Sequence, residues 1–246
     1  MKKTGLSLLF ILIGISVIGD DHIVYNLHTD AVEIMGQKQP ANDVEIHQWF
    51  NQKYAAVNMP GRRSVVDADK SMCYIIFEDQ KAYLKMPMPV QVTDYLPPQV
   101  AQYLSAQKIV VRVTELDETK DILGVKCKTY LASFDMGMTK IDMKFYVSED
   151  VPFDYSTYRD KFEEPMLRLT KENLDDAAFE ELKKMKGFQM GYEMTADMMG
   201  TKVVSRYEAV KITNEDAPVG TYLPPKNYKK LEQFPMPTPP AIPSQD

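Results

Sequence analysis

Strict alternation of apolar and polar residues is the feature that most constrains how this chain folds. It recurs from Val44 onward, for example in Val44–His47, Ile109–Val113 and Ile141–Phe145. A period of two places one side of a strand in a core and the other side in water. Many such segments joined by short turns predict a curved antiparallel sheet, whose inner face must be covered by something apolar.

Turn residues and interruptions of the alternation divide the chain into expected elements. Pro97 and Pro98 are expected to open a short helix, because proline is tolerated in a first helical turn. Leu174–Lys186 is expected to form the clearest helix, with Asn173 as its cap. The expected strands are Ile23–Met35, Val44–Met59, Arg62–Ala68, Cys73–Phe77, Ala82–Met86, Lys108–Leu116, Lys126–Met136, Thr139–Ser148, Phe188–Ala196 and Thr201–Ile212. The predicted class is mostly β (α+β): a curved antiparallel half-barrel that wraps two or three helices.

Residues 1–19 have the composition of a signal peptide. Lys2 and Lys3 form a positive start, and an apolar run follows over Leu6–Ile18. A retained membrane anchor is the alternative, but the run is shorter than the ~20 residues that span a bilayer. We expect cleavage near Gly19, which delivers an exported protein to the periplasm or outside the cell.

The rest of the chain is expected to form a single half-barrel domain over residues 20–234. Of the 246 residues, 44% are hydrophobic, which is enough for a substantial core. Without Lys2 and Lys3 the chain has 27 basic residues (29 minus 2) against 35 acidic ones, a net charge of -8. We therefore expect no nucleic-acid partner. No later stretch is apolar for long enough to be a transmembrane segment, and residues 235–246 are expected to be an exposed, disordered Pro-rich tail.

No pattern in the sequence indicates catalysis. The chain has no HExxH, no Gly-rich phosphate loop and no Gly-x-Ser-x-Gly elbow. Its three histidines, His22, His28 and His47, lie on or beside the first two expected strands. His28 and Asp30 share a strand face and could hold a metal weakly, but we favour a solvated strand face, because alternation alone already explains the two residues. We expect no enzyme, no metal site and no cofactor.

Cys73 and Cys127 are the only cysteines, and both lie in expected strands. An oxidising compartment would favour a disulfide between them, which would close a long loop and contribute about 4 kcal/mol. Two separate buried thiols are the alternative. The sequence leaves both arrangements open.

Methionine is unusually frequent, with 16 residues in the chain. Flexible thioethers suit irregular apolar space, either as plain core filling or as the lining of a ligand cavity. Alternate residues on one side of two late strands are the best candidates for that lining. They are Ile141, Met143, Phe145, Phe188, Met190, Tyr192 and Met194.

Several short motifs carry a resemblance to a known family. Ile122–Tyr130 contains Gly124, Cys127 and Tyr130 at a characteristic spacing, and Met143–Ser148 follows with its final valine and serine. Together with Lys186-Gly187-Phe188 and Leu223–Lys230, they resemble the signature of a secreted bacterial family catalogued as a domain of unknown function. That family is similar in fold to the LolA/LolB-type periplasmic lipoprotein carriers. The resemblance implies a half-barrel around helices and, as a ligand class, acyl chains.

Two functions are consistent with these observations. The first is non-enzymatic binding of a lipid-like or other apolar molecule in the half-barrel cavity. The second is a structural or interaction role in the cell envelope, with a barrel filled by its own side chains and another envelope protein as partner.

Overall fold

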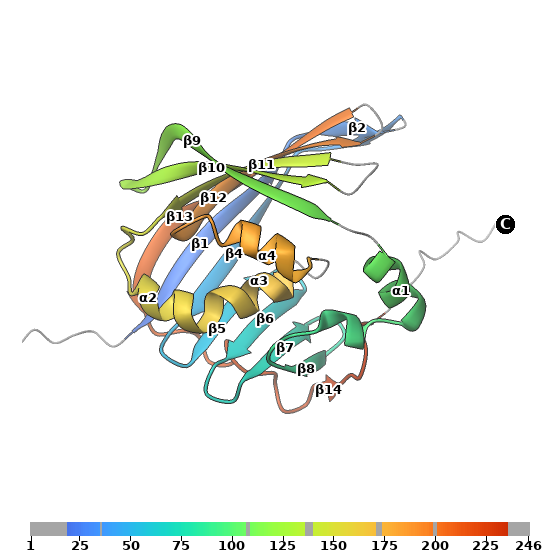
Figure 1. The fold of residues 1–246 in the computed structure, drawn as a ribbon. Helices are drawn as coiled ribbons and strands as arrows, with labels where there is room; N and C mark the ends of the chain where they lie inside the picture. The colour runs from blue at the N-terminus through green and yellow to red at the C-terminus, as the bar shows by residue number, and fades with distance from the viewer. Residues whose placement is uncertain are drawn as a thin grey trace, which may run out of the picture.

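The computed structural model describes residues 19–34, 36–106, 109–135, 140–170, 174–198 and 201–235. Most of the expected signal peptide and of the expected tail lies outside these residues. One 12-stranded sheet dominates the fold, in the order β14-β8-β7-β6-β5-β4-β1-β13-β12-β11-β10-β9. The sheet is strongly curved and wraps around the helices (Figure 1). Its order is open, with β14 and β9 at the two edges.

Neighbouring strands of the sheet are antiparallel, apart from the short parallel pair β14 and β8. A separate two-stranded sheet joins β2 and β3. The strands are β1 (Asp20–Thr29), β2 (Val32–Ile34), β3 (Gln37–Gln39), β4 (Asn42–Phe50), β5 (Tyr54–Met59), β6 (Arg62–Asp67), β7 (Met72–Phe77), β8 (Ala82–Pro87), β9 (Val110–Ile122), β10 (Val125–Asp135), β11 (Lys140–Ser148), β12 (Phe188–Met198), β13 (Thr201–Glu215) and β14 (Lys229–Lys230).

The helices lie in two groups. A 3-10 helix (Val92–Tyr95) and α1 (Pro98–Ala106) follow β8, and α1 begins at Pro98 as the sequence predicts. The second group covers the concave face of the sheet (Figure 1). We call this group the strap. It consists of α2 (Tyr155–Tyr158), a π-helical turn (Arg159–Glu163), α3 (Glu164–Thr170) and α4 (Asp176–Leu182).

The expectation of one strand over Val44–Met59 is wrong, because the chain reverses direction at Asn51. The Asn51 side-chain oxygen accepts hydrogen bonds from the backbone N–H groups of Lys53 and Tyr54, at 2.8 and 2.9 Å. Asparagine stabilises turns in this way, by replacing a backbone partner. The segment therefore forms the hairpin of β4 and β5.

The expected helix over Leu174–Lys186 is shorter in the structure. It begins after Asp175, whose carboxylate accepts from the N–H of Ala178 at 2.9 Å. It ends at Leu182, where the N–H of Met185 turns back to the Leu182 carbonyl at 3.1 Å. Asp175 is thus the cap in the structure, and the expected cap, Asn173, lies outside the described residues.

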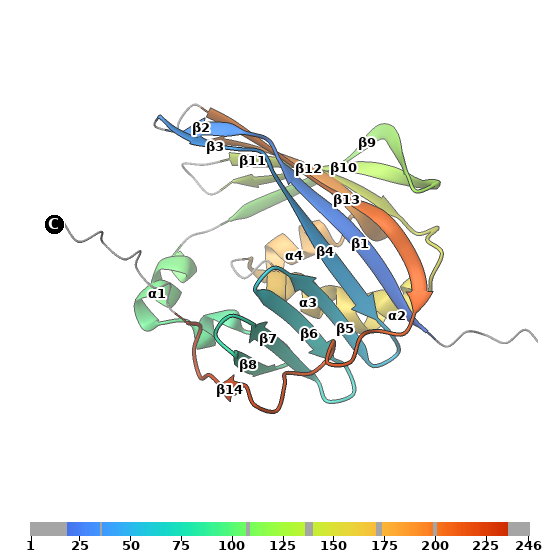
Figure 2. The same cartoon turned by 180° about the vertical axis from the view of Figure 1, so that it is seen from behind.

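Apolar side chains pack on both faces of the sheet. The main core fills the space between the concave face and the strap. A smaller cluster on the convex face includes Val65, whose neighbour Val66 points into the main core. Residues 216–235 run along this part of the sheet (Figure 2), and Tyr222 and Tyr228 pack on the smaller cluster. The C-terminal segment therefore covers part of the sheet opposite the strap.

Candidate functional site on the concave face

A row of directly opposed residues crosses the concave face. Directly opposed residues in adjacent antiparallel strands project from the same face. The row connects seven strands, from β4 to the edge strand β9. Its members are Val44, Leu27, Tyr207, Tyr192, Phe145, Tyr130 and Glu115.

Aromatic rings form the centre of this row. Tyr192 stacks on Tyr207 with ring centroids 5.0 Å apart, and Tyr207 stacks on Tyr25 at 4.4 Å. On the other side, Phe145 lies 5.9 Å from Tyr192 in a tilted arrangement. The concave face therefore presents a continuous aromatic surface at its middle.

Five of the seven predicted lining residues share this face. Phe145 and Tyr192 belong to the row, and Met143 is directly opposed to Met194 one step further along the strands. Ile141 occupies the next step. These five residues pack together, and Ala178 and Leu182 of α4 belong to the same apolar cluster.

The other two predicted lining residues lie beyond a β-bulge. Tyr146 pairs with Gly191 and Val147 pairs with Gln189, so Met190 is the extra residue. A bulge shifts the side-chain alternation by one residue. Phe188 and Met190 nevertheless belong to the core beneath the strap, where the Phe188 ring lies 6.3 Å from the Tyr155 ring and 5.1 Å from the Tyr158 ring of α2. The alternation along β12 did not reveal this interruption.

The degree of burial differs along the concave face. Met143, Phe145, Phe188 and Met190 are buried. The remaining predicted residues, Ile141, Tyr192 and Met194, are partly buried.

Three further members of the row are also partly buried, and sequence reasoning missed them. They are Val44, Leu27 and Tyr207. The alternation of Ile23, Tyr25 and Leu27 along β1 is the sequence signal that would have placed Leu27 on this face. The strap therefore leaves part of the apolar row incompletely covered.

Polar groups beneath the strap have partners in the protein. The Gln48 amide donates to the Tyr158 hydroxyl at 2.9 Å, and the Tyr155 hydroxyl donates to the Glu163 carboxylate at 3.1 Å. The Tyr25 hydroxyl donates to the Gln189 carbonyl at 3.1 Å. Burial raises the pKa of Glu163 above its ordinary value, because the charged form loses solvation.

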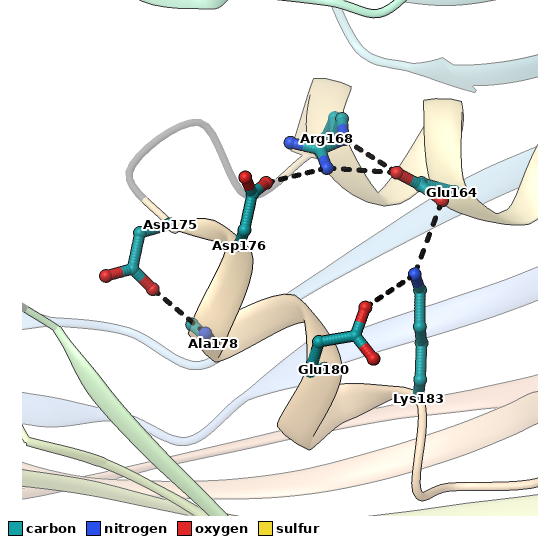
Figure 3. A network of polar contacts seen from close by, with 7 residues as sticks. All are labelled: Glu164, Arg168, Asp175, Asp176, Ala178, Glu180 and Lys183. Carbon is teal, nitrogen blue, oxygen red and sulfur yellow. Dashed lines mark hydrogen bonds and ion pairs between the residues drawn. The ribbon is translucent and has the colours of Figure 1, made fainter.

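The strap is held together on its polar side by charged residues. Arg168 of α3 contacts Glu164 at 2.9 Å and Asp176 of α4 at 3.0 Å (Figure 3). Lys183 bridges Glu164 and Glu180, at 3.6 and 2.9 Å. Since Arg168 and Lys183 both connect α3 to the α4 region, the network joins the two helices into one unit.

Cys73 and Cys127 are free and buried in the structure. They lie in β7 and β10, and the sheet order places β6, β5, β4, β1, β13, β12 and β11 between these two strands. Burial raises the pKa of the Cys73 thiol to about 12 and that of the Cys127 thiol to about 11. Of the two arrangements that the sequence left open, the structure contains the separate thiols.

The three histidines lie on the convex face of β1 and β4. His28 contacts Asp43 through Nδ1 at 2.9 Å and Asp30 through Nε2 at 3.1 Å, so both ring nitrogens face carboxylates. These contacts raise the pKa of His28, with the Asp43 hydrogen bond as the main cause. Within the described ranges, no group of three or more His, Cys, Asp or Glu side chains is arranged to hold a metal ion.

The chain matches no protein-family model and no curated protein in the two comparisons. The resemblance to the secreted bacterial family stays a prediction. In the part of the chain that the structure describes, none of the helices has the length and apolarity needed to cross a membrane.

Proposed function

We propose that the protein is a non-enzymatic envelope protein that binds a lipid-like or other apolar molecule between the concave face and the strap. The observation that carries this proposal is the partial burial of Val44, Leu27, Tyr207 and Tyr192. These residues face the concave side, where a filled core would bury them. An apolar ligand would remove the remaining exposed area from water, which is the main source of affinity for such molecules.

Two further observations support the proposal. The curved sheet wraps around helices, as the resemblance to the lipoprotein carriers implies (Figure 1). Arg168 and Lys183 join α3 to the α4 region, so the strap covers the concave face as one unit. Export through the signal peptide at residues 1–19 is part of this proposal, since an acyl carrier of this type acts in the periplasm.

A structural or interaction role in the envelope is the second candidate. The complete burial of Met190, and the burial of Met143, Phe145 and Phe188, favours it. These side chains are packed by the protein itself, as in an ordinary core. An open edge at β9 would then be available to a protein partner.

Substitutions at partly buried positions test the proposal without disrupting the core. We expect Met194→Glu and Leu27→Glu each to reduce the binding of an apolar fluorescent probe by at least tenfold. We expect a loss of stability of about 1–2 kcal/mol, because a partly exposed charge escapes most of the desolvation cost. Probe titration and urea denaturation measure the two effects.

Val210→Glu is the matched control, because Val210 is 50% exposed on β13 and lies outside the concave row. We expect it to leave probe binding unchanged. Native mass spectrometry of the wild-type protein should detect co-purified lipid. A wild-type protein that takes up no probe and carries no lipid would contradict the carrier proposal and favour the structural role.

A further inference from the structure

The hydroxyl groups of Tyr192 and Tyr207 are exceptions to the pairing of polar groups beneath the strap. The two residues are directly opposed on β12 and β13, and their ring planes are inclined by only 19°. Neither hydroxyl has a hydrogen-bond partner among the described residues. Tyr25, the third ring of the stack, uses its hydroxyl to donate to the Gln189 carbonyl. The middle of the concave face therefore carries two hydroxyls that the protein itself does not pair.

Both hydroxyls are accessible although their rings are partly buried. Neither is among the fully buried polar atoms that lack a partner in the described part of the chain, so both reach solvent. Burial raises the pKa of Tyr192 and Tyr207, so both stay protonated at neutral pH. A protonated hydroxyl is a hydrogen-bond donor. Two neutral donors thus lie side by side where the proposed ligand would bind.

The surroundings of these donors suit a ligand group that is polar but uncharged. The concave positions beside the two tyrosines carry no charge; they are Leu27, Phe145, Met194, Ser205 and Ala209. The one charged member of the row is Glu115 at the edge strand, which pairs with Lys128 at 3.2 Å. A carboxylate at the two tyrosines would lose solvation without gaining a cation. A carbonyl oxygen has two lone pairs and meets the donors without that cost.

Apolar side chains continue from the two tyrosines in both directions along the row. Leu27 and Val44 lie on one side, and Phe145 lies on the other. A ligand that lies along the row would therefore place hydrocarbon on both sides of a central acceptor. An ester that joins two apolar chains has this arrangement. A free fatty acid does not, because its polar group is terminal and ionised.

We propose that Tyr192 and Tyr207 anchor the ligand by donating to its carbonyl oxygen, and that the site selects a neutral ester over a fatty acid anion. This inference rests on the proposed function, because it concerns the polar group of the same ligand. The apolar row supplies affinity for the chains, and the two hydroxyls supply the selectivity.

Competition for the site tests this anchor. Diphenylhexatriene, a fluorescent hydrocarbon without an acceptor, reports the apolar surface, and pentyl hexanoate or its isomer undecanoate is added to displace it. At neutral pH we expect the ester to displace the probe from the wild type at a concentration roughly tenfold lower than undecanoate. Changing both residues, Tyr192→Phe and Tyr207→Phe, should weaken ester binding roughly tenfold through the loss of two hydrogen bonds. The affinity for diphenylhexatriene should not change, because phenylalanine keeps the ring.

Tyr228→Phe is the matched control, because Tyr228 packs on the convex face and donates to Glu78 at 2.6 Å. It should leave the binding of ester and probe unchanged. Urea denaturation of each variant checks that the fold is retained.

The outcomes separate the anchor from the carrier proposal. A wild type that takes up diphenylhexatriene, with ester binding that the two tyrosine substitutions leave unchanged, would overturn the anchor and keep the carrier. Undecanoate that binds as tightly as the ester would overturn the selectivity for a neutral group. A wild type that binds neither the probe nor the ester would overturn both proposals.

Discussion

Gly187 is the residue whose backbone most clearly requires glycine. It has φ of +132°, and a Cβ atom there would lie 2.6 Å from the backbone carbon of Ser148. Both the conformation and the close approach of two backbones exclude other residues. The connection from the strap to β12 therefore requires a residue without a Cβ atom at position 187.

We expect Gly187→Ala to destabilise the protein by more than about 3 kcal/mol, because neither backbone can move without breaking strand contacts. Gly124→Ala is the matched control. Gly124, in the β9–β10 turn, also has a positive φ, of +78°, but a Cβ atom added there would meet no other atom within 4 Å. We expect it to cost only about 1 kcal/mol. Equal losses in urea denaturation would show that the close approach to Ser148 is unimportant.

At the scale of elements, Arg168 is one of two basic residues that connect α3 to the α4 region. Arg168 contacts carboxylates on α3 and α4, and its guanidinium lies 4.3 Å from the centre of the Phe179 ring. Its partners are partly or fully exposed, so solvent weakens the ion pairs and the ring contact adds to them. The contacts of Arg168 thus make a modest contribution to joining α3 and α4.

We expect Arg168→Ala to reduce the free energy of unfolding by about 1 kcal/mol and to accelerate amide hydrogen exchange in α4. Arg159→Ala is the control, since Arg159 pairs with its exposed neighbour Asp160 at 2.9 Å and its guanidinium lies 6.0 Å from the Tyr155 ring. It should change stability by less than about 0.5 kcal/mol. Unchanged exchange in α4 after Arg168→Ala would argue against its role in joining the helices.

At the scale of the whole molecule, the strand order of the sheet separates Cys73 and Cys127, for which the sequence allowed a disulfide. Each thiol is fully buried, and burial raises the pKa values of both. Thiolates are the reactive form, so both thiols are expected to be inert in the folded protein.

We expect alkylation without reductant to label neither cysteine in the native protein and both after denaturation. Intact-mass measurement counts the added groups. Reductant should not change the count in denatured protein. Labelling that requires reductant would demonstrate a disulfide and contradict the arrangement of β7 and β10 in the sheet.

Local sequence was sufficient for the class of the fold and for much of the concave face. Alternation with a period of two depends only on neighbouring residues, and it predicted that Ile141, Met143 and Phe145 share a face. It did not reveal the bulge at Met190, because a bulge depends on how two strands meet. It failed at Asn51, where a side-chain hydrogen bond reverses the chain within an apolar segment.

The sequence by itself determined the mostly β composition, the antiparallel character of the sheet and which residues of its late strands lie on the same side, since these follow from local periodicity. Only the tertiary structure decided which strands are neighbours, and therefore which distant residues meet. His22, His47 and Glu215 come together because β1 lies between β4 and β13 in the sheet. Cys73 and Cys127 stay apart for the same reason, because strand order is set by the packing of the complete sheet around the strap.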